Sequence, residues 1–317
     1  MTKVSVIIPT YNRAATVHAS VQSALEQTYP LIEIIVVDDG STDDTAERLS
    51  TYLSRINFLR KRNAGPSAAR NHGARYANGD ILAFLDSDDV WSPEKIARQV
   101  ALMESYGNAM NCCVCNAQII YGAGKNDTYA FDIARIESEH EEAVWKNPGE
   151  VLASRFLLFN QVAAIKRNSF VKVGGYNPRI NLLEDHDLAL KLASLDGVWG
   201  MIKTPMVVKS DETRGIGVEC GKNPLEHARA QRIALTGVLE SGLIHDVDIR
   251  NHIEKRLRGN ARVIRNEEQI LSEDWMDRFA GRMGRVQSSI GNFIARRRIP
   301  GAVTKEVMVN KSCQTPP

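Results

Sequence analysis

Short apolar runs and helical patterns alternate over the first 106 residues, and this alternation constrains the fold more than any other feature of the sequence. The apolar runs, rich in β-branched residues, lie at residues 4–8, 32–37, 56–60 and 81–85, and the helical patterns follow them at residues 14–27, 42–54, 66–77 and 93–106. Parallel strands need a long crossover connection, usually a helix, whereas antiparallel strands need only a turn. The alternation therefore predicts an α/β fold with a mostly parallel sheet and helices on both faces.

Polar residues follow each of the four predicted strands. In chain order they are PTYN (residues 9–12), DDGS (38–41), NAGPS (63–67) and DSDD (86–89). Open α/β sheets bind their ligands outside the carboxyl ends of the strands. We therefore expect all four segments to line one crevice.

The common phosphate-binding signatures of α/β proteins are missing. No G-x-G-x-x-G follows the first predicted strand, and Gly124-Lys125 has neither the glycine five positions earlier nor the Ser or Thr that a P-loop requires. Forty Lys and Arg residues against 38 Asp and Glu residues give a net charge of +2, which is no reason to expect nucleic acid as a partner. The sequence thus argues against dinucleotide, ATP and nucleic-acid binding.

Two features bear on the location of the protein. No run of 18 apolar residues is present to span a bilayer, and residues 1–4 lead directly into a strand pattern without the apolar segment of a signal peptide. The five cysteines are an odd number, and the clustered Cys112, Cys113 and Cys115 fit neither zinc-finger spacing nor a disulfide framework. We expect a cytoplasmic protein whose clustered cysteines are buried, reduced thiols.

Four segments, taken in their order and spacing, resemble the family 2 glycosyltransferases, the inverting GT-A enzymes that use nucleotide-diphospho-sugars. They are VSVIIPTYN (residues 4–12), IVVDDGSTD (35–43), GPSAARN (65–71) and AFLDSDD (83–89). The similarity continues through Gly174-Gly175-Tyr176 and Glu184-Asp185, and it covers residues 3–210. It implies a GT-A sheet, mostly parallel and flanked by helices, and a UDP-sugar as donor.

Two carboxylates, Asp86 and Asp88, follow the fourth predicted strand and point to the same side of an extended segment. Carboxylate oxygens suit Mg²⁺ or Mn²⁺, and such an ion keeps open positions for the oxygens of a diphosphate. The sequence therefore predicts a metal site at Asp86 and Asp88. The resemblance implies that Asp88 binds the ion directly and that Asp86 contacts the sugar or the ribose. The alternative is that these residues cap a turn or the next helix, as we expect for Asp89.

The ends of the first three predicted strands contribute to the predicted nucleotide-sugar site. The resemblance implies that Asp39 accepts the imide N–H of uracil and that the Tyr11 ring stacks on the base. Arg70, early in the third predicted helix, offers a fixed fork of donors for the diphosphate, with a surface ion pair as the alternative. Asp38 and Asp43 equally suit turn or cap roles. The predicted nucleotide-sugar-binding residues are Pro9, Thr10, Tyr11, Asn12, Asp39, Ser67, Arg70, Asp86, Ser87 and Asp88.

The acidic pair Glu184-Asp185 opens a helical segment that we expect on the opposite wall of the cleft. An inverting transfer needs a carboxylate that takes the proton from the acceptor hydroxyl during attack. The resemblance implies that Asp185 is this general base and that Glu184 orients the base or the acceptor. The alternative is a pair of acids placed by the helix dipole. For His186, packing or an acceptor-side role is favoured over metal ligation.

The chain divides into a predicted GT-A catalytic domain, residues 1–217, and a helical C-terminal extension, residues 218–317, that ends in a frayed tail. Within the catalytic domain, residues 1–105 form the predicted nucleotide-binding half and residues 106–217 the acceptor half. Six apolar residues of the segment 278–298 lie within a helical stripe about 100° wide, and arginines flank it. Such a helix either contacts the anionic inner face of the plasma membrane peripherally or packs on protein.

The predicted function is the metal-dependent, inverting transfer of a hexose from a UDP-sugar to a saccharide or lipid-linked saccharide acceptor in cell-surface polysaccharide biosynthesis, such as that of an exopolysaccharide. The predicted cofactor is Mn²⁺ or Mg²⁺. Processive relatives carry a Gln-x-x-Arg-Trp motif and membrane helices, and their absence favours addition of one sugar per event. Two alternatives are a catalytically silent nucleotide-sugar-binding subunit and a sugar-nucleotide pyrophosphorylase. The pyrophosphorylase would need a glycine-rich loop with an arginine where PTYN stands.

Overall fold

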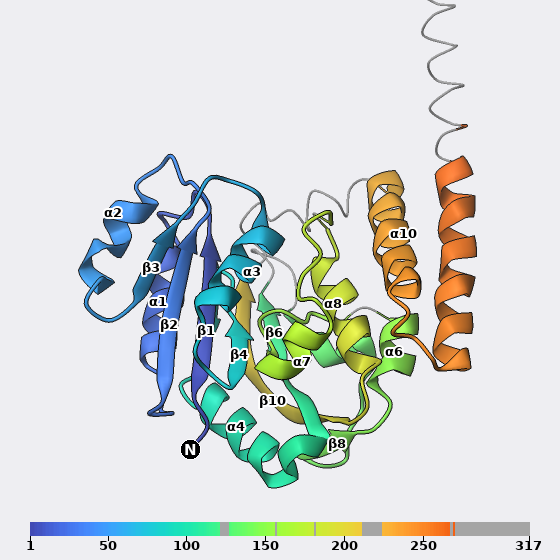
Figure 1. Ribbon diagram of the computed structural model, residues 1–317, viewed down its shortest axis with the longest axis horizontal. Coiled ribbons are helices and arrows are strands. Elements are labelled where there is room, and N and C mark those ends of the chain that lie inside the picture. The colour runs from blue at the N-terminus through green and yellow to red at the C-terminus, as the bar shows by residue number, and fades with distance from the viewer. Residues whose placement is uncertain (121–126, 156, 181, 211–223, 267–268, 270–317) are drawn as a thin grey trace, which may run out of the picture. The chain divides into compact units, whose positions relative to one another are not determined.

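A mixed sheet of ten strands forms the centre of the described chain, and helices flank it (Figure 1). The computed structural model describes residues 1–317 except 121–126, 156, 181, 211–223, 267–268 and 270–317. The strands are β1 (Val4–Thr10), β2 (Ile32–Asp38), β3 (Asn57–Arg60), β4 (Ile81–Phe84), β5 (Asp89–Trp91), β6 (Met110–Ile120), β7 (Thr128–Tyr129), β8 (Glu142–Trp145), β9 (Ala163–Lys166) and β10 (Val198–Ser210). Their order is β3-β2-β1-β4-β9-β6-β10-β5, with β7 beside β6 and β8 beside β10.

The helices follow the strands in the order that crossover connections require. They are α1 (Val17–Leu25), α2 (Thr45–Leu49), α3 (Pro66–Tyr76), α4 (Lys95–Tyr106), α5 (Ala130–Ala134), α6 (Pro148–Ser154), α7 (Arg167–Lys172), α8 (Glu184–Ala193) and α10 (Pro224–Glu240), with short 3-10 turns at Ser50–Tyr52 and Gly107–Ala109. Residues 247–266 form a further helix, which we name the C-terminal helix.

The first four strands and the helices after them lie where the alternation predicts. β1 pairs in parallel with β2 and β4, and β2 pairs in parallel with β3. All seven residues of β1 are buried, as expected for a parallel strand that is covered on both faces. The α/β prediction is confirmed. The carboxyl ends of β1 and β2 meet at one edge, where the N–H of Asp39 donates to the carbonyl of Thr10 at 2.9 Å.

The second half of the sheet mixes parallel and antiparallel strands. β9 lies antiparallel between β4 and β6. β10 runs for 13 residues parallel to β6, and the sequence did not predict it. Its register shifts on both sides of Pro205, which has no N–H for the ladder. Near its end, β10 pairs Lys209 with Asp89 of β5 and so adds a basic residue beside the acidic segment.

The clustered cysteines lie in β6, at the centre of the sheet. Cys112, Cys113 and Cys115 are free and fully buried, which confirms the prediction of buried thiols. Burial raises the pKa of the Cys115 thiol to about 11. Because the thiolate is the reactive form, these three residues belong to the core rather than to the chemistry of the protein.

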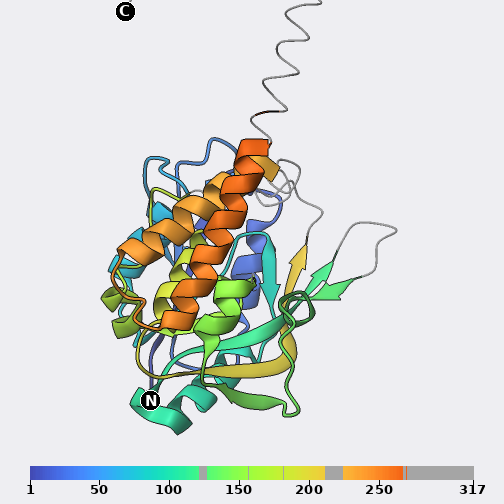
Figure 2. The same ribbon diagram turned by 90° about the vertical axis from the view of Figure 1, so that its right-hand side faces the viewer.

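The helices that follow the sheet belong to the same compact unit, Met1–Arg265. α10 packs against α8, and the C-terminal helix lies beside α10 (Figures 1 and 2). The predicted boundary at 217/218 falls in the undescribed segment 211–223, and the stripe at 278–298 and the frayed tail also lie outside the described residues. Among the helices that the structure describes, none combines the length and the apolar character that crossing a bilayer requires.

Candidate active site

A cavity of about 1210 Å³ opens at the carboxyl ends of β1, β2 and β4. One wall comes from the strand ends and α3, and the other from α8, α10 and the segments around α5 and β9. The predicted residues that line it are Pro9, Thr10, Tyr11, Asp39, Arg70, Asp86, Ser87, Asp88, Glu184 and Asp185, and His186 joins them. Asn12 and Ser67 are not among the lining residues. The structure thus brings ten of the twelve predicted residues to one cavity.

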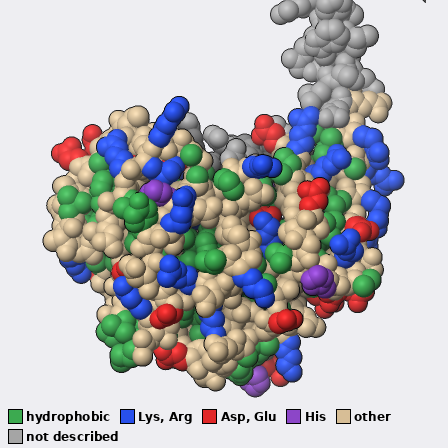
Figure 3. All heavy atoms as spheres, viewed as in Figure 1, with side chains coloured by type: hydrophobic (Ala, Val, Ile, Leu, Met, Phe, Trp, Pro, Cys, Tyr) green, Lys and Arg blue, Asp and Glu red, His purple; other side chains and the backbone are tan. Residues whose placement is uncertain are grey.

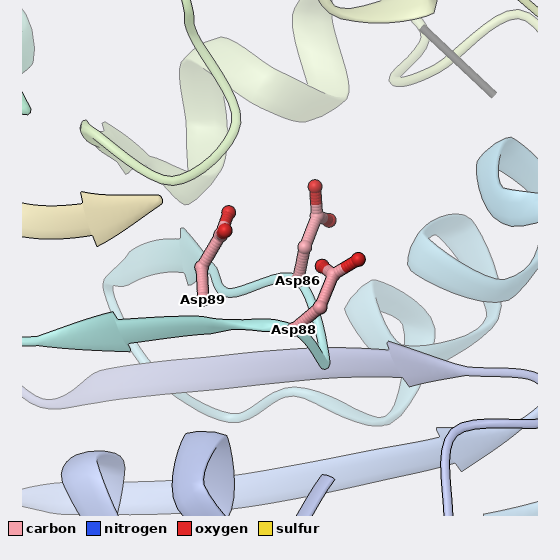
Figure 4. Close-up of side chains that lie close together, drawn as sticks. All are labelled: Asp86, Asp88 and Asp89. Atoms are coloured by element: carbon pink, nitrogen blue, oxygen red, sulfur yellow. The ribbon is translucent and has the colours of Figure 1, made fainter. Parts of the chain in front are cut away.

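Three carboxylates gather where β4 ends and β5 begins. Asp86, Asp88 and Asp89 point to the same side of the chain, and each offers an oxygen within 4.8 Å of the other two (Figure 4). Asp89 is fully buried, and neither of its carboxylate oxygens has a hydrogen-bond partner among the described residues. Burial, together with the charges of Asp86 and Asp88, raises the pKa of Asp89 to about 8. The prediction that Asp89 caps a turn or helix is wrong, because it is a strand residue of this cluster.

This carboxylate cluster, Asp86, Asp88 and Asp89, fits a hard divalent cation. Close carboxylates repel one another, and a cation between them removes that repulsion. Two basic side chains partly balance the charge, with Arg13 Nη2 at 3.5 Å from Asp88 and Lys209 Nζ at 3.7 Å from Asp89. Apart from the ion pair with Lys209, the oxygens of buried Asp89 have no hydrogen-bond partner among the described residues, and a metal ion would satisfy them.

Arg70 joins the two walls of the cavity. Its Nη2 donates to Asp86 Oδ1 at 2.6 Å, and its Nη1 donates to Glu184 Oε1 at 2.8 Å. The side chain is almost fully buried, with its guanidinium carbon 5.3 Å from the centroid of the Tyr176 ring. Burial opposes the charge, but the Asp86 and Glu184 carboxylates raise the pKa of Arg70 above its ordinary value. The alternative of a surface ion pair is wrong, since both ion pairs are at the cavity wall and Arg70 is buried.

Asp185 lies in the first turn of α8. The chain enters this helix through Leu183, whose left-handed backbone (φ 64°) turns Glu184 and Asp185 toward the cavity. Asp185 Oδ1 accepts the N–H of His186 at 2.8 Å, and Oδ2 accepts the N–H of Phe159 at 3.4 Å. Burial and the neighbouring Glu184 raise the pKa of Asp185 to about 7, although Arg70 acts in the opposite direction. A carboxylate with this pKa can take up a proton near neutral pH.

His186 follows Asp185 and is only 1% exposed. Its Nε2 lies 3.2 Å from Arg256 Nη1 in the C-terminal helix. Burial, with a smaller contribution from the charge of Arg256, lowers the pKa of His186 to about 3. The imidazole is therefore neutral at physiological pH.

The nucleotide side of the cavity is organised by hydrogen bonds to the chain itself. Asp39 accepts the N–H groups of Ala64 at 3.1 Å and Gly65 at 2.8 Å, and it pairs with Lys61. These bonds fix its carboxylate at the cavity wall. Tyr11 lines the same cavity and is 45% exposed, as a residue that stacks on a base requires.

Four other predicted polar residues hold loops rather than line the cavity. Asp38 accepts the N–H of Ser41 at 2.8 Å, and Asp43 accepts that of Ala14 at 3.1 Å, which agrees with the turn interpretation of both. Asn12 adopts φ 51° and accepts the N–H of Thr42 at 2.8 Å. Ser67 donates to the carbonyl of Ile180 at 3.3 Å. Asn12 and Ser67 thus support the site through the backbone around it.

The sequence does not indicate several of the residues that line the cavity. Gln161, whose Nε2 donates to Asp86 Oδ2, follows a segment without any motif. Lys209 comes from β10, which was not predicted, and only Arg13 has a local signal, because it directly follows PTYN. An apolar surface and two polar residues of α10 complete the wall opposite the strand ends: Ile119, Ile133, Leu158, Leu182, Leu183, His227 and Gln231.

Comparisons with known sequences point to one family. The family model described as "Glycosyl transferase family 2" matches residues 5–167. An uncharacterized glycosyltransferase of Haemophilus influenzae is 34% identical over 198 residues, which are 59% of this chain and 61% of that protein. The Escherichia coli protein WfgD, a UDP-Glc:alpha-D-GlcNAc-diphosphoundecaprenol beta-1,3-glucosyltransferase, is 43% identical over 102 residues, which are 32% of this chain and 40% of WfgD. The chain therefore matches less than two thirds of the length of these relatives.

Comparisons with solved structures concern the fold. Staphylococcus aureus TarS in complex with UDP-GlcNAc gives a TM-score of 0.62 at 17% identity, over 82% of this chain and 72% of that one. The mannosyltransferase PcManGT of Pyrobaculum calidifontis, in complex with GDP-Man and Mn²⁺, gives a TM-score of 0.58 at 18% identity, over 94% of this chain and 81% of that one. The predicted GT-A fold is confirmed.

Proposed function

Since the chain belongs to glycosyl transferase family 2, we propose that it transfers a hexose from a UDP-sugar to a saccharide or lipid-linked saccharide acceptor, with inversion at the anomeric carbon. One observation carries the proposal. In a single cavity, buried Arg70 bonds Asp86 of the carboxylate cluster on one wall and Glu184, the neighbour of Asp185, on the other. A site for a diphosphate and a proton acceptor on facing walls is what such a transfer needs.

The proposal includes a divalent cation, Mg²⁺ or Mn²⁺, held by Asp86, Asp88 and Asp89. When bound, the ion supplies positive charge that offsets the charge developing on the departing UDP. The oxygens of buried Asp89, which lack hydrogen-bond partners among the described residues, support this assignment. The Mn²⁺ of the Pyrobaculum structure is consistent with it.

The donor proposed is a UDP-hexose, with UDP-glucose as the first to test. Asp39 would accept the imide N–H of uracil, and the Tyr11 ring would stack on the base. Two relatives support a uridine donor, because WfgD is named for UDP-Glc and TarS was solved with UDP-GlcNAc. Arg70 already donates to Asp86 and Glu184. Its first role would therefore be to orient these two carboxylates, and it would contact the diphosphate from that position.

In the proposed reaction, Asp185 takes the proton of the acceptor hydroxyl. The hydroxyl oxygen forms a bond to the anomeric carbon on the face opposite UDP, the bond from that carbon to the phosphate oxygen breaks, and UDP leaves with the electron pair. Arg70 holds Glu184 in place, and the negative charge of Glu184 keeps the pKa of Asp185 raised. The alternative of a catalytically silent subunit is disfavoured, because the carboxylate cluster, Arg70 and the proposed base Asp185 all line the same cavity.

The acceptor proposed is a lipid-linked saccharide, and the protein would act in the cytoplasm in surface-polysaccharide biosynthesis, adding one sugar per event. The apolar side chains opposite the strand ends offer a surface for an amphiphilic acceptor, among them Ile119, Leu158 and Leu182. The WfgD name, with GlcNAc-diphosphoundecaprenol as acceptor, supports this choice. Peripheral membrane contact through residues 278–298 remains part of the proposal.

The deciding experiment is a transfer assay with purified protein, Mn²⁺, a panel of UDP- and GDP-sugars, and a short-chain GlcNAc-diphospholipid acceptor. We expect a product with UDP-glucose or another UDP-hexose whose anomeric configuration, read by NMR, is opposite to that of the donor. Retention of configuration, or turnover of GDP-sugars alone, would contradict the proposal.

A further inference from the structure

The C-terminal helix, residues 247–266, reaches the active site through Arg256. One guanidinium nitrogen, Nη1, lies 3.2 Å from His186 Nε2 in α8. The same nitrogen donates to the carbonyls of Leu152 at 3.3 Å and Ala153 at 2.9 Å, in the last turn of α6. A helix end leaves such carbonyls without partners inside the helix. Arg256 therefore ties the end of α6 to the start of α8.

Packing fixes the face of the C-terminal helix that carries Arg256. Ile253 is fully buried, and Ile249 and Leu257 pack against the core. The spacing from 249 to 253, 256 and 257 places these side chains on one face of the helix. Ile249 also packs directly on Gly149 of α6, where an added Cβ would come within 2.6 Å of Ile249 Cδ1 and displace it. The helix cannot turn Arg256 away from α6 and α8 without breaking these contacts.

The chemistry of the contact decides the state of the His186 ring. A guanidinium offers donors only, so Nε2 of His186 must accept and the ring proton must lie on Nδ1. Burial and the charge of Arg256 also keep the ring neutral by lowering the pKa of His186. Arg256 thus selects one tautomer of a neutral imidazole.

The contact leads directly to Asp185. The N–H of His186 donates to Asp185 Oδ1 at 2.8 Å, and both residues lie in the turn that the chain enters through left-handed Leu183. A ring anchored by Arg256 therefore fixes the backbone donor that orients the Asp185 carboxylate.

We infer that Arg256 is a positioning residue for Asp185, acting through the neutral Nδ1–H tautomer of His186. This inference rests on the proposed function. It assigns to the C-terminal helix, which lies beyond the family match at 5–167, a part in completing the active site.

The kinetic test compares Arg256→Met with Arg262→Met, a change at an exposed residue of the same helix. Figure 3 shows basic side chains at the right-hand edge of the molecule, where this helix lies. Misplacing a catalytic group slows the chemical step more than it weakens donor binding, so we expect Arg256→Met to lower kcat at least about tenfold with KM for the UDP-sugar within about twofold. Arg256→Lys, which keeps a donor, should recover part of kcat, and Arg262→Met should match the wild type. A kcat of Arg256→Met equal to that of the wild type, or an equal loss in Arg262→Met, would overturn the inference.

A second readout does not measure activity. In protein labelled with ¹⁵N-histidine, the His186 signals are assigned by their loss in His186→Gln, and the ring nitrogens report the tautomer. We expect a protonated Nδ1 and an unprotonated Nε2 in the wild type, and a mixture of tautomers in Arg256→Met. The opposite tautomer in an active wild type would overturn the inference alone. A wild type that transfers no sugar would contradict the proposed function instead.

Discussion

Asp86 on the strand-end wall and Asp185 on the α8 wall are held in opposite ways, whereas the pKa of Asp89, the buried neighbour of Asp86, is raised like that of Asp185. On the strand-end wall, burial disfavours the charge of Asp86, but Arg70 and Lys209 outweigh it and lower the pKa of this carboxyl. On the α8 wall, burial and Glu184 raise the pKa of Asp185 to about 7, and the donors to its oxygens among the described residues are the backbone N–H groups of Phe159 and His186. Both walls share Arg70, which bonds Asp86 and Glu184 but not Asp185.

The difference indicates a division of labour. A carboxylate that stays ionised suits a metal ion and a diphosphate, whereas one that titrates near neutral pH suits proton transfer. Carboxylates thus serve two purposes in one cavity. Arg70 bonds Asp86, whose pKa is lowered, and does not bond Asp185, whose pKa is raised. Each of the following changes removes one part of this contrast.

The largest effect is expected from Asp185→Asn, which removes the proposed proton acceptor and keeps the size of the side chain. Transfer should fall about 1000-fold or more, because general-base catalysis contributes on this scale. Affinity for the UDP-sugar, measured by calorimetry without acceptor, should stay within about twofold. The exposed residue Asp132 provides a control, since Asp132→Asn removes a charge from a residue of α5 that does not line the cavity. Transfer by Asp185→Asn at a rate near that of the wild type would assign the base elsewhere.

Arg70→Gln removes the group that both walls share. Two carboxylates would then lose a buried partner, and removing one member of a buried pair costs about 3–5 kcal/mol of unfolding free energy. Thermal or urea unfolding measures this loss. Transfer should fall as well, because Asp86 and Glu184 lose their common anchor. A stability equal to that of the wild type would mean that Arg70 does not hold the walls together.

Metal removal tests the strand-end wall by itself. UDP affinity should rise about 10- to 100-fold when Mn²⁺ is added to the wild type. Asp88→Ala should lose most of that rise. Because Asp185 belongs to the other wall, Asp185→Asn should keep the full Mn²⁺ dependence. UDP binding by the wild type that ignores Mn²⁺ and chelator would contradict the metal assignment.

The smallest expected effect concerns the charge of Glu184. Glu184→Gln removes the like charge that helps to raise the pKa of Asp185. The pH at which transfer is half-maximal should therefore move to lower values, while a hydrogen bond from Arg70 to position 184 remains possible. Rate measurements across a pH series, compared with the wild type, detect the shift. An unchanged midpoint would mean that the charge of Glu184 does not contribute to this pKa.

The strand-end wall was predictable because its residues follow strands directly. The carboxyl ends of neighbouring parallel strands meet at one edge of a sheet, and this rule alone predicts that the segments 9–12, 38–41 and 86–89 contribute to one crevice. In the structure each of the three contributes residues to the cavity. Asp89 was interpreted as a cap, because nothing local indicates the short strand β5, which forms only by pairing with β10. Lys209 was missed for the same reason, since β10 is bent at Pro205 and lacks a regular apolar pattern.

The α8 wall was predictable only in part. Glu184 and Asp185 were found through a family motif, but the partners that set their chemistry come from far along the chain. Phe159 donates to Asp185 over 26 residues, and Arg256 contacts His186 over 70 residues. Contacts of this range depend on how helices pack, and local sequence patterns do not encode them.

The contrast between the walls is tested most directly by measuring transfer and UDP-glucose binding over the same pH series at saturating Mn²⁺. The Asp185 carboxyl, with its pKa raised to about 7, must be ionised to accept a proton. The rate should therefore be constant above this pH and fall about tenfold per pH unit below it, while binding stays flat between about pH 6 and pH 8. A rate that stays constant down to about pH 5, or a rate and an affinity that fall together, would contradict the account.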